Sequence, residues 1–287
     1  MHYKYNMKGV ILAGGKGLRL YPLTKVTNKH LLPVGREPMI LNPVRKLVES
    51  GINEILIVTS TEHMGSIVNL LGGGKELGCN FTYKVQESAG GIAHALLLAE
   101  NFAKGDKIVV ILGDNITTAS IKPFVEKFQK QEKGALVLLK SVTDPHRFGV
   151  AAIDEKQVIE IEEKPQSPKS NFAVIGYYMY DPQVFDIIRG TKPSARGEYE
   201  ITSVNNEYIK RGELAYEILD GDWTDAGTFE SLVYANQLLM QSEPHAVLAS
   251  SEKPQLESQD VSQEQVRKMI GEFEGKIGEL KKHLKGA

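Results

Sequence analysis

Short apolar segments rich in β-branched residues alternate with segments of helical spacing in the first part of the chain. The expected strands are residues 10–12, 55–58, 81–85 and 107–112, and the expected helices between them are 38–50, 62–71 and 91–103. Runs such as KIVVIL show no polar alternation, which is typical of strands covered on both faces. The sequence therefore predicts an α/β fold: a Rossmann-like, mostly parallel sheet flanked by helices.

The second half of the chain is richer in expected strands. Four segments carry this signal: ALVLLKSV, VAAI, VIEIEE and FAVIGYYMY. They predict a smaller mixed α+β region built onto the same sheet. No fixed repeat period is present in the sequence, so a solenoid or propeller is not supported.

The composition changes near Gln241. We expect a domain over residues 7–241, a Ser/Pro/Glu-rich linker over 242–261 and an amphipathic helix over 262–287. The helix would begin at a capping box, and its apolar residues recur at alternating spacings of four and three: Val266, Ile270, Phe273, Ile277, Leu280 and Leu284. Docking of this helix onto its own domain and self-association are equally compatible with the pattern.

Charge and cysteine content exclude several classes of protein. The chain has 34 basic and 36 acidic residues, which gives no electrostatic footprint for nucleic acid but allows a small anionic ligand. The single Cys79 excludes an internal disulfide framework. No apolar run is long enough to span a bilayer and the start has no signal region, so we expect a cytoplasmic protein without a membrane partner.

A glycine-rich segment, LAGGKGLRLYPLTKVTNKHLLP, follows the first expected strand. It is not a Walker loop, because Lys16 is followed by Gly17 and not by a hydroxyl residue. It does not fit a dinucleotide fingerprint either, since Leu20 stands where the third glycine is needed. The loop can still bring backbone N–H groups close to phosphates and place cationic side chains beside them.

Six motifs in order carry a resemblance to a known family. They are AGGKGLR, NKHLLP, ILGDN at 111–115, EEKP at 162–165, GEYEIT at 197–202 and WTDAGT at 223–228. Over residues 7–241 the chain resembles the sugar-1-phosphate nucleotidyltransferases, and most closely the short glucose-1-phosphate thymidylyltransferases. The resemblance implies Mg²⁺-assisted, in-line transfer of a nucleotidyl group from dTTP to glucose 1-phosphate, giving dTDP-glucose and pyrophosphate.

The resemblance also implies which residues hold the nucleoside triphosphate and the metal. The nucleotide would contact Leu12, Gly14, Gly15, Gly17, Arg19, Lys29, Gln86, Gly91 and Asp114. Gln86 carries both a donor and an acceptor, as reading a pyrimidine edge requires. Asp114 and Asp225 would share one Mg²⁺, an ion that uses few carboxylates together with substrate phosphates.

The sugar 1-phosphate would bind to residues from later motifs. These are Asn115, Gly149, Glu163, Lys164, Val174, Arg196 and Glu198. Lys164 would meet the sugar phosphate, and Glu163 would hold sugar hydroxyls. The catalytic set implied is Arg19, Lys29, Asp114, Lys164 and Asp225.

Two positions depart from the family pattern. Leu18 stands where a Ser or Thr is usual, and Gly90 replaces a common acidic residue. Two alternatives therefore stay open: the same reaction with UTP or another sugar 1-phosphate, and a non-catalytic nucleotide-sugar-binding regulator. Related enzymes are commonly oligomeric, so by analogy we expect a homo-oligomer.

Overall fold

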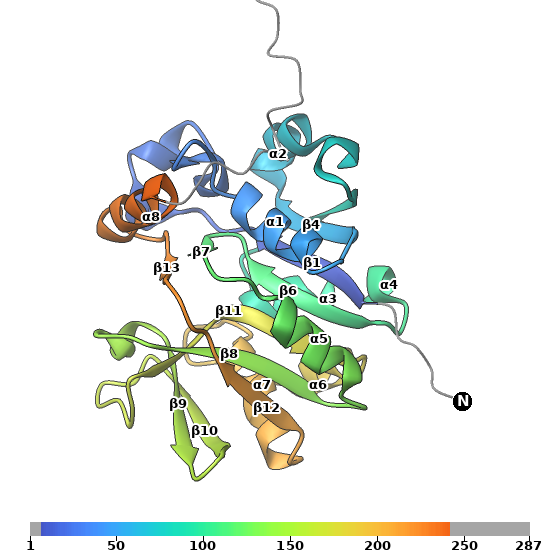
Figure 1. The fold of residues 1–287 in the computed structure, drawn as a ribbon, viewed down its shortest axis with the longest axis vertical. Helices are drawn as coiled ribbons and strands as arrows, with labels where there is room; N and C mark the ends of the chain where they lie inside the picture. The colour runs from blue at the N-terminus through green and yellow to red at the C-terminus, as the bar shows by residue number, and fades with distance from the viewer. Residues whose placement is uncertain (1–6, 242–287) are drawn as a thin grey trace, which may run out of the picture. The chain divides into compact units, whose positions relative to one another are not determined.

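The computed structural model describes residues 7–241 (Figure 1). The expected linker 242–261 and helix 262–287 lie outside the described residues. None of the described helices is both long enough and apolar enough to cross a membrane.

One large sheet organises the described part of the chain. Its main path runs in the order β10-β9-β11-β6-β1-β4-β5, and β8 and β12 join it beside β11. The parallel portion consists of β5 (Asn80–Gln86), β4 (Glu54–Ser60), β1 (Met7–Ala13) and β6 (Lys107–Leu112). The mostly parallel α/β sheet predicted from the sequence is confirmed.

Helices cover both faces of this sheet, which is why its central strands are apolar on both sides. The even-numbered residues Val10 and Leu12 of β1 pack under α3 (Ile92–Leu97), α4 (Glu100–Ala103), α6 (Val184–Gly190) and α7 (Ile201–Lys210). Ile11 and Ala13 pack on the other face, under α1 (Leu41–Glu49), α2 (Met64–Leu71) and α5 (Lys122–Lys130). Continuous burial along β1 follows from its place between two helical layers.

The second half of the chain extends the same sheet with antiparallel strands. These are β8 (Ala135–Ser141), β9 (Gly149–Asp154), β10 (Gln157–Glu163) and β11 (Phe172–Tyr180), with β12 (Leu214–Ile218) parallel to β8. β11 pairs with β6 through residues 177–180 and with β9 through residues 173–174. It thus joins the parallel half of the sheet to the β9–β10 hairpin (Figure 1).

Two short ribbons and a helix complete the fold near the glycine-rich loop. β7 (Asn115–Thr117) pairs with β13 (Trp223–Asp225), and β2 (Pro33–Val34) pairs with β3 (Glu37–Pro38). The helix α8 (Phe229–Gln241) packs on both ribbons through a third apolar cluster. Residues far apart in sequence are thereby brought to the carboxyl ends of β1 and β6.

The elements differ from the sequence-based expectation in several places, and the helices α5 to α8 are among those that were not expected. The expected helix 91–103 is interrupted between α3 and α4, at Leu98 and Ala99. The strands β12, β7 and β13 were not expected, because each is short and its burial depends on a partner strand distant in the sequence.

Candidate active site

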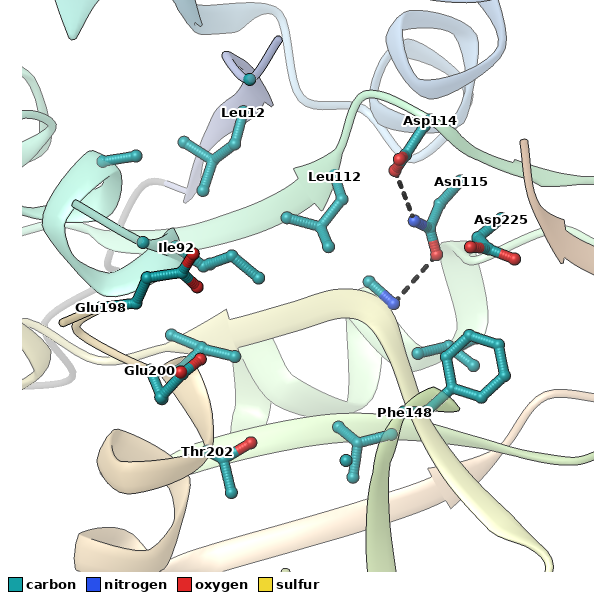
Figure 2. Close-up of a pocket in the computed structure, with 18 of the residues that line it drawn as sticks. Leu12, Ile92, Leu112, Asp114, Asn115, Phe148, Glu198, Glu200, Thr202 and Asp225 are labelled. Carbon is teal, nitrogen blue, oxygen red and sulfur yellow. Dashed lines mark hydrogen bonds between the residues drawn. The ribbon is translucent and has the colours of Figure 1, made fainter. Parts of the chain in front are cut away.

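A cavity of about 400 Å³ lies at the carboxyl ends of β1 and β6. Ligands of open α/β sheets bind at this position, where strand order reverses. Figure 2 shows side chains from several motifs converging there. The cavity is lined by all the residues expected to bind substrates or metal except Gly17: Leu12, Gly14, Gly15, Arg19, Lys29, Gln86, Gly91, Asp114, Asn115, Gly149, Glu163, Lys164, Val174, Arg196, Glu198 and Asp225.

The glycine-rich loop forms one wall of the cavity. Gly15 has a φ of 101°, a conformation that favours glycine, and Gly14 faces the side chain of Gln86. Gly17 also has a positive φ, of 60°, but it lies against Thr24 and does not line the cavity. The geometry therefore assigns Gly17 to shaping the turn, whereas Gly14 and Gly15 line the cavity.

Lys29 and Asp114 form an ion pair in the cavity, with 2.5 Å between Lys29 Nζ and Asp114 Oδ2. Burial alone would raise the pKa of Asp114, but the adjacent Lys29 ammonium, His30 and the Asn115 amide hold it below its usual range. These neighbours therefore favour the ionised, carboxylate form of Asp114.

The pKa of Asp225 is shifted in the opposite direction. Burial and the nearby Asp114 raise its pKa to about 6, although Arg147 opposes the shift. The Arg147 Nη2 atom lies 3.1 Å from each Asp225 carboxylate oxygen, and its Nη1 atom lies 2.8 Å from Asp144. Arg147 was not among the residues singled out from the sequence, because only the fold brings it to Asp225.

Asp114 and Asp225 are the two carboxylates of the cavity that could hold a divalent cation. Asp225 is destabilised as an anion by Asp114, and a bound cation would relieve that repulsion. Across residues 7–241 there is no cluster of three or more histidine, cysteine or acidic side chains able to hold a metal. A site with two carboxylates suits Mg²⁺, which takes its remaining ligands from substrate phosphates and water.

Asn115 organises the centre of the cavity. Its side-chain oxygen accepts hydrogen bonds from Trp223 Nε1 at 2.8 Å and from the Gly176 backbone N–H at 3.0 Å. Its side-chain nitrogen donates to Asp114 at 3.0 Å, and the dashed lines in Figure 2 mark two of these bonds. Since Asn115 is buried and its side chain makes these three hydrogen bonds, it positions Asp114 and β13 relative to β11.

The cavity wall opposite the glycine-rich loop carries both acidic and basic side chains. Glu163 accepts a hydrogen bond from Thr202 Oγ1 at 2.6 Å, and Arg196 bonds to Glu200 at 2.8 Å. Figure 2 shows Glu198, Glu200 and Thr202 along this wall. Thr202 and Glu200 belong to the GEYEIT motif, so the sequence signal was present although these two residues were not selected.

Lys164 has an unusual backbone. Its φ of 47° lies in the left-handed region, which is rare for a residue with a side chain. Its backbone N–H donates to the Phe148 carbonyl at 2.9 Å, directly after β10 ends at Glu163. A strained lysine that lines a cavity is typical of a functional position.

The two departures from the family pattern have different surroundings. The Leu18 side chain is 74% exposed and does not line the cavity, so it leaves the cavity wall unchanged. A Cβ at Gly90 would lie 2.6 Å from His94 Nδ1. The missing side chain at residue 90 therefore makes room for the His94 ring.

Residues 8–242 match the nucleotidyl transferase family. The chain belongs to this family. Nucleotidyl transferases of this kind take a nucleoside triphosphate and a sugar 1-phosphate as substrates, and they generally use a divalent metal ion. The match covers the whole described domain and includes every motif that reaches the cavity.

Several relatives in the family are similar over most of their length. The glucose-1-phosphate thymidylyltransferase of Neisseria meningitidis is 44% identical over 79% of this chain and 80% of its own. The enzyme of the same name from Mycobacterium tuberculosis is 42% identical over 80% of this chain and 81% of its own.

Two solved structures share the nucleotidyl transferase fold. One is a Bacillus anthracis chain provisionally assigned as a glucose-1-phosphate thymidylyltransferase and solved with sucrose; it is 58% identical, covers 84% of this chain and 98% of its own, and has a TM-score of 0.81. The other, a UDP-glucose pyrophosphorylase with UDP-glucose, is 27% identical, covers 80% and 97%, and has a TM-score of 0.73.

Proposed function

We propose that this protein transfers a thymidylyl group from dTTP to glucose 1-phosphate, giving dTDP-glucose and pyrophosphate. One observation carries the proposal: a single cavity holds a glycine-rich loop on one wall, a lysine with acidic residues on the other, and two carboxylates between them. The names of the relatives from Neisseria meningitidis and Mycobacterium tuberculosis support the choice of substrates.

The nucleotide would bind on the wall formed by β1 and β5. Backbone groups of Gly14 and Gly15 approach the triphosphate, while Arg19 and Lys29 neutralise its oxygens. Gln86 and Gly91, at the end of β5 and the start of α3, face the base. This division leaves the α-phosphate pointing toward Asp114 and Asp225.

The sugar 1-phosphate would bind on the wall formed by β10 and α7. Lys164 pairs with its phosphate and Glu163 with its hydroxyl groups. A phosphate oxygen attacks the α-phosphorus, a new P–O bond forms, and the bond to pyrophosphate breaks. No general base is needed, because the second pKa of a phosphate monoester is about 6 and the nucleophile is already ionised. Catalysis then depends on bringing two anions together in line.

Asp114 and Asp225 would hold Mg²⁺ beside the reacting phosphate. When bound, the ion neutralises charge that develops on the phosphoryl oxygens. Lys29 keeps Asp114 ionised, and Arg147 keeps Asp225 ionised and oriented. Both carboxylates are thus prepared as ligands by neighbouring cations of this chain.

A rival within the same reaction class uses UTP in place of dTTP. The fold is shared with a UDP-glucose pyrophosphorylase, and thymine differs from uracil by one methyl group. A methyl group in an apolar pocket discriminates by only about 1–3 kcal/mol. The protein is therefore expected to prefer one of the two nucleotides over the other without excluding either.

The test is a screen of pyrophosphate release with dTTP, UTP, CTP, ATP and GTP against glucose 1-phosphate and other sugar 1-phosphates. We expect the highest kcat/KM with dTTP and glucose 1-phosphate. Asp225→Asn is the matched control, since it removes a metal ligand and should lower turnover by orders of magnitude without unfolding the domain. Binding of nucleotide sugar without turnover of any pair would support the regulator instead.

A further inference from the structure

His94 lies on α3, next to the cavity residues Gln86 and Gly91, and does not line the cavity itself. Its Nδ1 atom is 3.1 Å from the side-chain nitrogen of Gln86. An amide nitrogen can only donate, so the imidazole Nδ1 accepts this hydrogen bond. The ring therefore carries its hydrogen on Nε2.

The orientation of the Gln86 amide is set by a second contact. The same amide nitrogen lies 3.5 Å from the Gly91 carbonyl oxygen, where a flipped amide would place two oxygens together. The amide oxygen points the other way, toward Gly14 in the glycine-rich loop. With both N–H groups directed at His94 and Gly91, the oxygen is the part of the Gln86 amide that remains to accept a hydrogen bond from a ligand in the cavity.

The His94 ring is itself held in place. It stacks on Tyr199, with ring centroids 6.4 Å apart and an interplanar angle of 29°. The Tyr199 backbone N–H donates to the Gly90 carbonyl at 2.8 Å, and the Ala93 N–H donates to the Tyr199 carbonyl at 3.1 Å. Any side chain at residue 90 would collide with the ring. The glycine at this position and the histidine four residues later therefore act together.

We propose that His94 is a positioning residue that fixes the Gln86 amide with its oxygen toward the base. An outward acceptor matches a base that carries a ring N–H donor, as thymine and uracil do at N3. Cytosine has an unprotonated acceptor at N3, so it would face the Gln86 oxygen without a hydrogen. The arrangement favours nucleotides whose pyrimidine carries an N3–H donor, such as dTTP and UTP, over CTP. This inference rests on the proposed function, because it assumes that a pyrimidine nucleotide occupies this wall.

The experiment compares the full-length wild type with two variants. His94→Phe keeps an aromatic ring against Tyr199 and removes both ring nitrogens. His94→Asn is the conservative variant, because its side-chain oxygen can take the place of Nδ1 as acceptor. Dissociation constants for dTTP, UTP and CTP are measured by titration calorimetry, and KM and kcat are measured with glucose 1-phosphate.

For His94→Phe we expect the dissociation constant and KM for dTTP to rise about five- to tenfold, as for one lost hydrogen bond. The preference for dTTP over CTP should fall by about as much, while kcat at saturation stays near that of the wild type. His94→Asn should restore both the affinity and the preference. If His94→Phe does not fold, His94→Leu provides the same loss of acceptor with a smaller side chain.

Three results would overturn the proposal. Unchanged dTTP affinity and CTP discrimination in a folded variant without the acceptor would show that Gln86 is held without His94. Equal defects in the Asn and Phe variants would assign the effect to packing. A wild type that binds CTP as tightly as dTTP would remove the selectivity itself. By contrast, a wild type that binds these nucleotides but transfers none of them would refute the proposed function and leave the role of His94 intact.

Discussion

At the scale of single residues, we propose that the ammonium group of Lys164 binds the phosphate of the sugar 1-phosphate. Lys164→Met keeps most of the side-chain volume and removes only the ammonium. We expect KM for glucose 1-phosphate to rise roughly tenfold or more, because a charge-assisted hydrogen bond is worth about 1.5–3 kcal/mol. Turnover should also fall, whereas dTTP affinity in calorimetry should hardly change. Loss of dTTP binding with a normal KM for the sugar phosphate would mean that Lys164 binds the nucleotide. The two substrates would then have to be assigned to the opposite walls of the cavity.

Arg147 is expected to set the acidic limit of activity. Burial and Asp114 raise the pKa of Asp225 to about 6, and Arg147 has the largest effect among the groups that lower it. In Arg147→Met that pKa should rise further, by about one unit. Since Asp225 must be ionised to hold a cation, the acidic limb of the kcat/KM profile should move to higher pH. Arg147→Lys should return the limb toward the wild-type position; an unmoved limb in the Met variant contradicts the role.

His30 makes stability depend on pH. Burial, followed by the charge of Lys29, lowers its pKa from 6.5 to about 3, and its Nδ1 donates to Asn28 Oδ1 at 2.6 Å. The unfolded chain therefore binds a proton between these values that the folded chain does not. The contribution of neutral His30 to the free energy of unfolding is fully present above about pH 6.5, and it falls by about 1.4 kcal/mol per pH unit toward pH 3.

The measurement is urea unfolding of the wild type and His30→Asn from pH 7 to pH 4. The Asn variant keeps a donor for Asn28 but cannot titrate, so its stability should fall less steeply with acid. The exposed His146 supplies the control, and His146→Asn should keep the wild-type slope. Parallel slopes for all three proteins would exclude His30 as the acid-sensitive group.

At the scale of elements, the turn between β5 and α3 packs closely against the segment before α7. Gly91 has a φ of 95°, and a Cβ there would lie 2.6 Å from the Tyr199 carbonyl oxygen. Gly91→Ala should therefore cost about 1–3 kcal/mol in unfolding free energy and weaken nucleotide binding. Gly105→Ala is the matched control, since its φ is 83° but nothing lies within 4 Å of the added atom. Equal losses in both variants would leave only backbone strain as the cause.

The elements that the sequence predicted are those whose signal is local. β6 and β11 were predicted at the residues observed, because each is an unbroken apolar run buried on both faces. β12 was not, because its stability depends on pairing with β8 about eighty residues earlier. The break between α3 and α4 contains neither glycine nor proline, so nothing local marked it.

Most of the cavity lining could be predicted from the family resemblance, including Gln86, Gly91, Gly149 and Val174, which lie outside the six motifs. The residues expected from six motifs meet in one cavity, with Gly17 set back from it. Arg147 and His94 were not foreseen, because their importance comes from Asp225 and Gln86, which only the fold brings to them.

At the scale of the whole molecule, chemistry is expected to reside in residues 1–241. The family match ends at residue 242, and no cavity residue in the described structure lies beyond Asp225. A chain ending at Gln241 should keep kcat and both KM values within about twofold of the full-length protein. The check is steady-state kinetics alongside size measurement by light scattering. A truncated chain that folds and assembles normally but is inactive would assign a catalytic role to the remaining residues.

The pairing of β13 with β7 sets the moment during synthesis at which the enzyme can become active. β7 follows Asp114 directly, and register places Asp225 opposite Asn115. A ribosome has made β1, β4, β5 and β6 by residue 112, so the growing chain can fold its parallel strands early. The second carboxylate arrives more than one hundred residues later. A polypeptide released before that point would carry the glycine-rich loop but only one of the two carboxylates to which we assign the metal, so we expect incomplete translation products to be catalytically inactive.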